Sequence, residues 1–354
     1  MQVWNFYFTP YYIFVKLLQS SVKYGIIIKK LIVILYRLEQ NMSDLITIIV
    51  PCYNEQETIP YFLDAMNKVY NSMKQKYDID MEYLFVDDGS KDKTLEVLKE
   101  CSKKDPNVSY LSFSRNFGKE GAVFAGITQA EGDCIAVMDC DLQHPPETLI
   151  KMYRLWEDGY QVIEGVKASR GRESFIHKMF AKTFYSIISD ATGIDMSRAS
   201  DFKLMDRQAA EEFLKLPERN VFFRALSSWV GFKTTYVEFD VQEREAGESK
   251  WSFKSLVRYA VNNITSFSAA PMQIVTFFGV VFFVFAVLLG IQSLYMYFSG
   301  HAVAGFTTVI LLLLLVGSIL MFSLGVIGYY IAKIYDEVKM RPRYIISEVI
   351  KSKE

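Results

Sequence analysis

The first hydrophobic pattern in the chain alternates short apolar runs with longer stretches of helical composition. The runs are rich in β-branched and aromatic residues and are predicted as buried strands at Ile46–Val50, Tyr83–Val86, Val108–Phe113, Cys134–Met138 and Gln161–Val166. The stretches between them are predicted as helices at Glu57–Tyr77, Lys91–Ser102 and Lys119–Ala130. Strands that alternate with helices predict an α/β fold with a mostly parallel sheet, covered by helices on both faces.

The second pattern is a long uncharged stretch. From Tyr259 to Ala332 the sequence contains no Asp, Glu, Lys or Arg. A membrane span needs about 20 mostly apolar residues, and two segments meet this need, at about 272–298 and 306–331. Soluble helices rarely stay uncharged for so long, so a transmembrane hairpin is favoured over a helical hairpin buried in a soluble core.

Positive charges predict the orientation of this hairpin. Its polar turn carries no Lys or Arg, whereas both outer flanks carry several. By the positive-inside rule, the large domain and both termini are predicted to face the cytoplasm. The predicted segments are a basic, aromatic N-terminal extension (1–41), a cytoplasmic α/β domain (42–258), a transmembrane hairpin (259–335) and a cytoplasmic tail (336–354).

Two membrane-related features leave alternatives open. The extension 1–41 either lies on the inner leaflet or precedes a natural start at Met42. From Ser174 to Ser189, apolar residues recur at helical spacing beside basic ones. This face is predicted to press on the membrane, or else to pack on the sheet or on a neighbouring subunit of a homo-oligomer.

Composition excludes other classes. The 39 basic residues nearly balance the 40 acidic ones, which does not suggest a nucleic-acid binder. The four cysteines form no CxxC pair, and with three histidines a Cys/His zinc site is not expected.

Polar clusters follow four of the predicted strands. They are Pro51–Glu55, Asp87–Ser90, Ser114–Asn116 and Asp139–Asp141. Because the carboxyl ends of parallel strands meet at one edge of a sheet, and ligands bind beyond that edge, these clusters predict the site.

Asp139 and Asp141 are the predicted metal ligands. In an extended segment, carboxylates two residues apart point the same way, and Gln143 adds a further oxygen. Such a set suits Mg²⁺ or Mn²⁺. The alternative is a solvated turn.

The remaining loop residues suit a nucleotide. Of Asp87 and Asp88, we expect one to cap the following helix and the other to bind a base or ribose. Glu55 is expected to contact the base, unless it belongs to an ordinary helix start. Neither G-x-G-x-x-G nor a P-loop is present, so metal and cations would hold the phosphates. Candidate groups for that role are Arg170, Arg244, Ser249 and Lys250.

Together these motifs resemble the polyprenyl-phosphate glycosyltransferases, which are family 2 glycosyltransferases that include bactoprenol glucosyltransferases and are similar to dolichol-phosphate mannosyltransferases. The motifs are Pro51–Glu55, Val86–Ser90, Ser114–Glu120, Asp139–Glu147 and Gly247–Trp251. The resemblance covers about 44–339. It implies a GT-A fold, a nucleoside-diphosphate sugar donor (UDP-glucose above others), a divalent metal, inversion at the anomeric carbon, and a polyprenyl phosphate acceptor such as undecaprenyl phosphate.

The resemblance also implies residue roles. The donor would be held by Pro51, Tyr53, Glu55, Asp87, Asp88, Lys119, Asp139, Arg170, Arg244, Ser249 and Lys250, and the metal by Asp139, Asp141 and Gln143. Asp201 and Asp141 are the catalytic assignments, with Asp201 orienting the acceptor more than acting as a base.

The expected location is the bacterial cytoplasmic membrane, and a protein ending near Tyr259 is expected to keep the catalytic fold. The rival functions are a processive membrane polysaccharide synthase and a catalytically inactive membrane scaffold.

Overall fold

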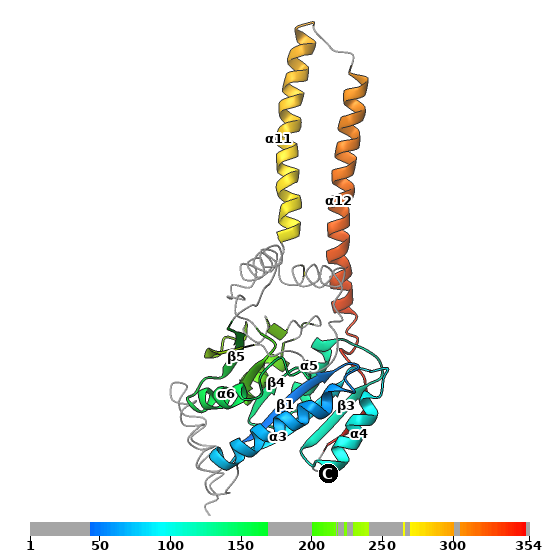
Figure 1. The fold of residues 1–354 in the computed structure, drawn as a ribbon. Coiled ribbons are helices and arrows are strands. Elements are labelled where there is room, and N and C mark those ends of the chain that lie inside the picture. The colour runs from blue at the N-terminus through cyan, green and yellow to red at the C-terminus, as the bar shows by residue number, and fades with distance from the viewer. Residues whose placement is uncertain are drawn as a thin grey trace, which may run out of the picture.

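The computed structural model describes residues 43–168, 200–216, 218, 223–224, 229–240, 265, 270–300 and 305–351. In it, an α/β domain carries a long hairpin of two helices that extends away from the sheet (Figure 1).

The described strands form one mixed sheet in the order β7-β5-β6-β4-β1-β2-β3-β8. Its strands are β1 (Leu45–Cys52), β2 (Asp80–Asp87), β3 (Val108–Phe113), β4 (Cys134–Val137), β5 (Val162–Lys167), β6 (Lys203–Asp206), β7 (Thr234–Phe239) and β8 (Ile346–Ile350). Strands β3, β2, β1 and β4 are all parallel, and β5 is parallel to β7. Strand β6 is antiparallel to β4 and β5, and β8 is antiparallel to β3. The predicted α/β fold with a mostly parallel sheet is confirmed.

Alternation along the strands produces two hydrophobic layers. In β1, Ile46, Ile48 and Val50 face one layer and Ile49 faces the other. The first layer includes residues of α3 (Thr58–Tyr77), α4 (Thr94–Lys104) and α6 (Thr148–Glu157). The second includes α5 (Lys119–Gln129) and α8 (Arg207–Leu214). Helices therefore cover both faces, because successive side chains of a strand point to opposite sides.

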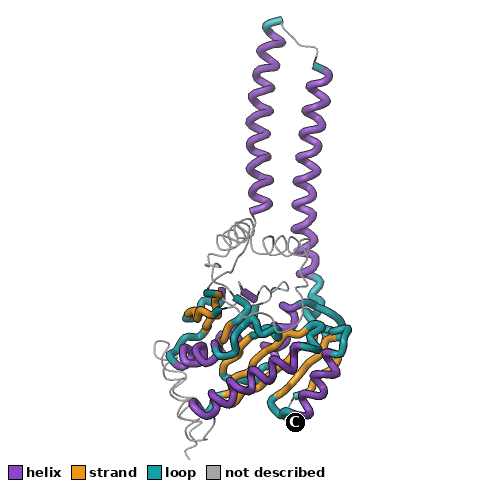
Figure 2. The backbone as a smooth tube through the Cα atoms, in the orientation of Figure 1, coloured by secondary structure: helices purple, strands orange, loops and turns teal. Residues whose placement is uncertain are grey.

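The hairpin consists of α11 (Ala270–Phe298) and α12 (Phe306–Val338), which run side by side in Figures 1 and 2. Two helical stretches, Pro271–Phe298 and Leu312–Val338, are long and apolar enough to cross a membrane, with mean hydropathies of 2.9 and 2.3. Their side chains are largely exposed in the isolated chain. This is unlike the core helix of a soluble protein, as the sequence pattern predicts.

The chain after α12 returns to the sheet as β8. This strand pairs with the outer edge of β3, and the Tyr110 hydroxyl donates a hydrogen bond to Glu348 at 2.6 Å. The sequence pattern predicts 336–354 as a tail outside the α/β domain. The strand is five residues long and its partner lies more than 200 positions earlier, so no local pattern indicates the pairing.

Candidate active site

Four loops meet at the carboxyl edge of β1, β2, β3 and β4, and hydrogen bonds join them. The Asn54 amide donates to the Ser90 hydroxyl at 2.9 Å, and the Glu55 amide donates to the Thr94 hydroxyl at 2.8 Å. The Thr58 hydroxyl lies 3.4 Å from the sulfur of Cys140 in the loop after β4. The structure thus brings the polar clusters together, as the parallel arrangement of their strands requires.

Asp87 and Asp88 are both buried and both hold neighbouring loops. Asp87 accepts hydrogen bonds from the Ser112 hydroxyl at 2.7 Å and the Ser90 amide at 3.0 Å. Asp88 accepts from the backbone amides of Phe117 and Gly118 at 2.6 and 2.9 Å. Burial raises the pKa of Asp88, although these two amides oppose the shift.

Neither of these carboxylates caps α4, so that expectation was wrong. The carboxylate at the start of α4 is instead that of Asp92, which accepts from the amide and the hydroxyl of Thr94 at 3.0 and 2.6 Å. The reason is that the chain first turns through Gly89, whose φ is +64°. Donor binding by Asp87 or Asp88 stays a prediction.

Glu55 lies at the start of α3. Its carboxylate accepts from the Thr58 hydroxyl at 2.7 Å, and its carbonyl oxygen accepts from the Thr58 amide at 3.2 Å. These contacts with Thr58 agree with the alternative that Glu55 belongs to an ordinary helix start. A contact between Glu55 and a nucleotide base stays a prediction. Pro51 lies in β1, and Tyr53 follows that strand directly.

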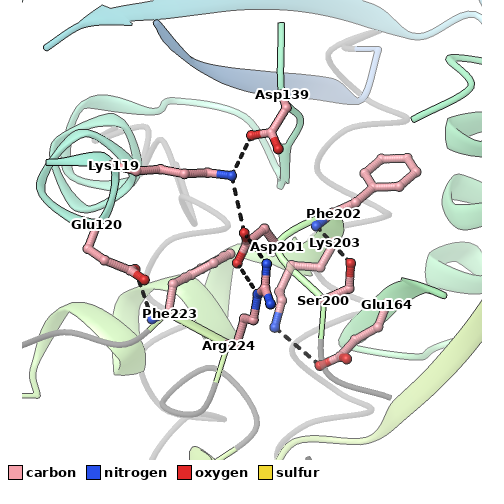
Figure 3. Close-up of polar contacts among 10 residues, drawn as sticks. All are labelled: Lys119, Glu120, Asp139, Glu164, Ser200, Asp201, Phe202, Lys203, Phe223 and Arg224. Carbon is pink, nitrogen blue, oxygen red and sulfur yellow. Dashed lines mark hydrogen bonds and ion pairs between the residues drawn. The ribbon is translucent and has the colours of Figure 1, made fainter. Parts of the chain in front are cut away.

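Lys119 joins two acidic residues from different parts of the chain (Figure 3). Its ammonium lies 2.6 Å from Asp139 Oδ1 and 3.1 Å from Asp201 Oδ2. Lys119 is the first residue of α5, Asp139 follows β4, and Asp201 precedes β6. Burial alone would raise the pKa of Asp139, but the Lys119 charge, the His144 charge and the hydrogen bond from Lys119 together hold that pKa below its ordinary value.

Asp201 is also held by Arg224. The guanidinium Nε and Nη2 donate to Oδ1 and Oδ2 at 2.6 and 2.7 Å, which is a bidentate pair (Figure 3). Burial opposes ionisation of Asp201, but Arg224 and then Lys119 hold its pKa well below the usual range. Asp201 is therefore a carboxylate with little basicity at neutral pH.

The predicted metal ligands lie in a turn and not in an extended segment. Strand β4 ends at Val137, the Asp141 carboxylate accepts from the Gln143 amide at 3.2 Å, and Leu142 has a φ of +56°. The strand-alternation argument for Asp139 and Asp141 was therefore wrong, because the chain leaves the sheet before either residue.

The donor set still fits Mg²⁺ or Mn²⁺. Such ions take one or two carboxylates and complete their shell with water and phosphate oxygens. Asp139, Asp141 and the Gln143 side chain would supply oxygen ligands of this kind from a single loop. Within the part of the chain that the structure describes, no three His, Cys, Asp or Glu side chains form a metal cage.

Sequence reasoning missed several groups beside Asp201. Glu120 accepts from the Phe223 amide at 3.0 Å, and burial together with the Asp201 charge raises its pKa to about 7. Lys203 and Glu164 form a fully buried ion pair at 3.2 Å between β6 and β5. Glu120 belongs to a motif noted in the sequence, whereas the short strand β6 gives no local signal.

His144 connects the loop of the predicted metal ligands, residues 139–143 (the metal loop), to the segment that carries Asp201. Its ring stacks on Phe202 with centroids 4.7 Å apart, and Phe239 meets it edge-on at 5.5 Å. Burial lowers the pKa of His144. Phe202 directly follows Asp201, so this stack fixes the backbone that carries the carboxylate.

Four predicted donor-binding residues lie outside the described residues, namely Arg170, Arg244, Ser249 and Lys250. The predicted amphipathic helix from Ser174 to Ser189 and the extension 1–41 lie outside them as well.

A sheet with acidic loops gathered at its carboxyl edge defines the GT-A class of fold, and comparison with known proteins agrees. The family model for glycosyl transferase family 2 matches residues 47–214. An uncharacterized glycosyltransferase of Bacillus subtilis, YkcC, is 40% identical over 310 residues, covering 85% of this chain and 93% of that protein. The bactoprenol glucosyl transferase of Shigella phage SfII is 35% identical over 308 residues, covering 86% of this chain and 97% of that protein.

Among solved structures, mannosyl-3-phosphoglycerate synthase from Rubrobacter xylanophilus aligns with a TM-score of 0.44 at 14% identity, over 65% of this chain and 74% of that chain. On the strength of the chain-long relatives, the protein belongs to glycosyltransferase family 2. It is accordingly a glycosyltransferase, and the resemblance noted in the sequence is confirmed.

Proposed function

We propose that this protein transfers a hexose, glucose above others, from a nucleoside-diphosphate sugar to a polyprenyl phosphate at the cytoplasmic face of a bacterial membrane. UDP-glucose and undecaprenyl phosphate are the proposed substrates. The product would be a lipid-linked sugar that serves as donor for cell-surface glycan modification.

One observation carries the proposal. The chain that holds Asp139 and Asp201 also carries an apolar hairpin, and the match to a bactoprenol glucosyl transferase spans both parts of the chain. A soluble sugar acceptor would not require such a hairpin, whereas an acceptor embedded in a bilayer must meet its enzyme at the membrane surface. The hairpin is proposed to span the membrane, with the catalytic domain and both termini on the cytoplasmic side.

Asp139, Asp141 and Gln143 would hold Mg²⁺ or Mn²⁺ together with the donor diphosphate. When bound, the ion supplies charge that stabilises the leaving diphosphate. Lys119, 2.6 Å from Asp139, adds a cation at the same place. The neighbouring loops, with Pro51, Tyr53, Glu55, Asp87 and Asp88, are proposed to surround the nucleoside.

The acceptor chemistry does not require a strong base. A phosphate monoester has a second pKa of about 6, so it is mostly dianionic at neutral pH. Its oxygen can attack the anomeric carbon from the face opposite the leaving diphosphate, forming one C–O bond while the other breaks, with inversion. Asp201, whose pKa Arg224 and Lys119 hold low despite burial, would orient the acceptor and stabilise positive charge on the sugar ring.

The direct test is transfer of labelled sugar into lipid. Membranes or purified full-length protein are incubated with a panel of nucleotide sugars, undecaprenyl phosphate and Mg²⁺ or Mn²⁺. We expect a chloroform-soluble product that mild acid cleaves. A long polymer would indicate the polysaccharide synthase, and no transfer with any donor would indicate the inactive scaffold.

Variants of the metal loop test the residue assignment. Asp139→Asn and Asp141→Asn should each lower turnover on the order of 100- to 1,000-fold, because the leaving diphosphate loses its neutralising partner. Asp64→Asn, on the exposed face of α3, is the matched control and should keep wild-type turnover. Normal activity in either loop variant, or full activity in excess EDTA, would contradict the assignment.

A further inference from the structure

We infer that Arg224 is a positioning residue of the transfer reaction, acting through the carboxylate of Asp201. The inference rests on the proposed function and adds to it a residue that no sequence motif indicates. Arg224 lies 23 positions after Asp201, yet its guanidinium meets both oxygens of that carboxylate.

The contact geometry restricts Asp201 strongly. Arg224 donates to Oδ1 of Asp201 at 2.6 Å and to Oδ2 at 2.7 Å. The ammonium of Lys119, on α5, lies 3.1 Å from the same Oδ2 (Figure 3). A planar guanidinium that binds both oxygens fixes the plane of a carboxylate, which a single ammonium does not. With Arg224 in place, rotation of the Asp201 side chain would break two charge-assisted hydrogen bonds.

The position of Arg224 is itself set by the residue before it. The Phe223 amide donates to Glu120 Oε2 at 3.0 Å. The Phe223 ring is buried, packs edge-on against Phe213 at 5.5 Å, and lies 4.9 Å from the ammonium of the buried Lys203. Backbone and side chain at position 223 are thus anchored to α5, α8 and β6, and the guanidinium extends from a fixed point.

The arrangement has a specific consequence for the reaction. The Lys119 ammonium lies at ion-pair distance from both Asp139 and Asp201, so the two carboxylates belong to one site. If Asp201 must present its negative charge in one orientation, Arg224 contributes by holding that orientation and not by touching substrate. Its loss should then lower kcat and leave the KM for the lipid acceptor unchanged.

A double-mutant cycle separates this role from direct substrate binding. We expect Arg224→Met to lower kcat on the order of 100-fold, the size typical of a misplaced site group. Arg224→Lys, which keeps the charge without the fork, should recover part of that loss. The Asp201→Asn/Arg224→Met double variant should be no slower than Asp201→Asn within about 2-fold, because residues acting as a unit are not additive.

The matched control is Arg207→Met. Arg207 also binds with two nitrogens, to the carbonyl oxygens of Ala130 and Gly132, which precede β4 at the edge of the sheet opposite the site. It should lose thermal stability and keep its kcat per folded molecule. Thermal unfolding of every variant, monitored by tryptophan fluorescence, shows whether a loss of kcat comes from a loss of folded protein.

Two results would overturn the inference. In the first, the fold losses in kcat of the two single variants multiply in the double variant, and Arg224→Met raises the KM for the acceptor. That result would mean that Arg224 binds the acceptor phosphate itself. The other is unchanged kcat in Arg224→Met. The cycle is measured with whichever acceptor supports turnover in the substrate panel, so failure of the polyprenyl proposal and failure of the Arg224 role give different results.

Discussion

At the residue scale, the site is a chain of alternating charges. Asp139, Lys119, Asp201 and Arg224 follow one another at ion-pair distance, and the Glu120 carboxyl lies beside them. Lys119 pairs with both Asp139 and Asp201, and Arg224 pairs with Asp201, so the charges of these four side chains nearly cancel before any substrate binds. Glu120 is the exception, because it is a partly buried acid held close to the negative charge of Asp201.

Glu120 should therefore give protein stability a specific pH dependence. Burial and the Asp201 charge raise its pKa from 4.5 to about 7, so the folded protein favours the neutral acid while the unfolded chain ionises. The folded state then binds more protons than the unfolded state, and stability falls as pH rises from about 4.5 through about 7.

Glu120→Gln keeps an acceptor for the Phe223 amide and removes this titration. Relative to wild type, its unfolding midpoint should rise with pH across that window and level off above it. Thermal unfolding of the full chain between pH 5 and pH 8 measures this, with the exposed Glu211→Gln in α8 as the control. A variant curve parallel to the wild-type curve would show that Glu120 does not titrate in this range.

At the scale of elements, helix α5 carries Lys119 and Glu120 into the site from a very close contact with β1. A Cβ built on Gly126 would lie 2.3 Å from Ile49 Cγ2, so the helix can rest on the strand only with glycine at that position. A Cβ on Gly121, five residues earlier, would meet its nearest neighbour at an ordinary 3.6 Å. Packing at Gly126 thus sets how deeply the first turn of α5 enters the site.

The two glycines form a matched pair for a stability experiment. Gly126→Ala should destabilise the protein by about 1–3 kcal/mol, because the extra methyl overpacks a closed contact. Gly121→Ala should be neutral or stabilising by up to about 1 kcal/mol, since alanine is the better helix former. Thermal or chemical unfolding compares them, and equal effects would mean that α5 is free to shift outward.

At the scale of the whole molecule, the chain leaving the hairpin fastens the catalytic domain. Arg343 donates to the carbonyl oxygens of Leu216 and Glu218 at 2.9 and 2.6 Å, and Tyr344 stacks on Phe113 at 5.1 Å. Strand β8 then covers the edge of β3. The segment that follows α12 is therefore fastened to the α/β domain by side-chain contacts and by strand pairing.

This connection changes the expected outcome of truncation. A protein ending near Tyr259 loses β8 and Tyr344, which leaves the β3 edge unpaired and Phe113 exposed, and such edges favour aggregation. We now expect it to fold poorly, contrary to the expectation from sequence.

Point variants test the connection in the full chain. Arg343→Ala should lower stability by about 1–3 kcal/mol through its two lost hydrogen bonds, and Arg341→Ala, exposed two positions earlier, should not. Thermal unfolding compares the two variants. Equal stability, together with a soluble, folded protein truncated near Tyr259, would contradict the role of this segment.

Local patterns along the chain are enough to predict the class of fold, the edge that carries the site and the apolar hairpin. These follow from local periodicity, because a strand buried on both faces must be apolar and a span must be uncharged over its length. Four polar loops after parallel strands must also share one edge, so the grouping of Asp87, Asp139 and their neighbours follows from the order of strands and helices alone.

Which side chains meet depends on how distant segments of the chain pack together. Arg224 reaches Asp201, and Glu348 reaches Tyr110, across separations of 23 and 238 residues. Burial patterns record whether a residue faces the core, whereas partners depend on how α5, α8 and β8 pack against the sheet, and that packing is the sum of many contacts between distant segments.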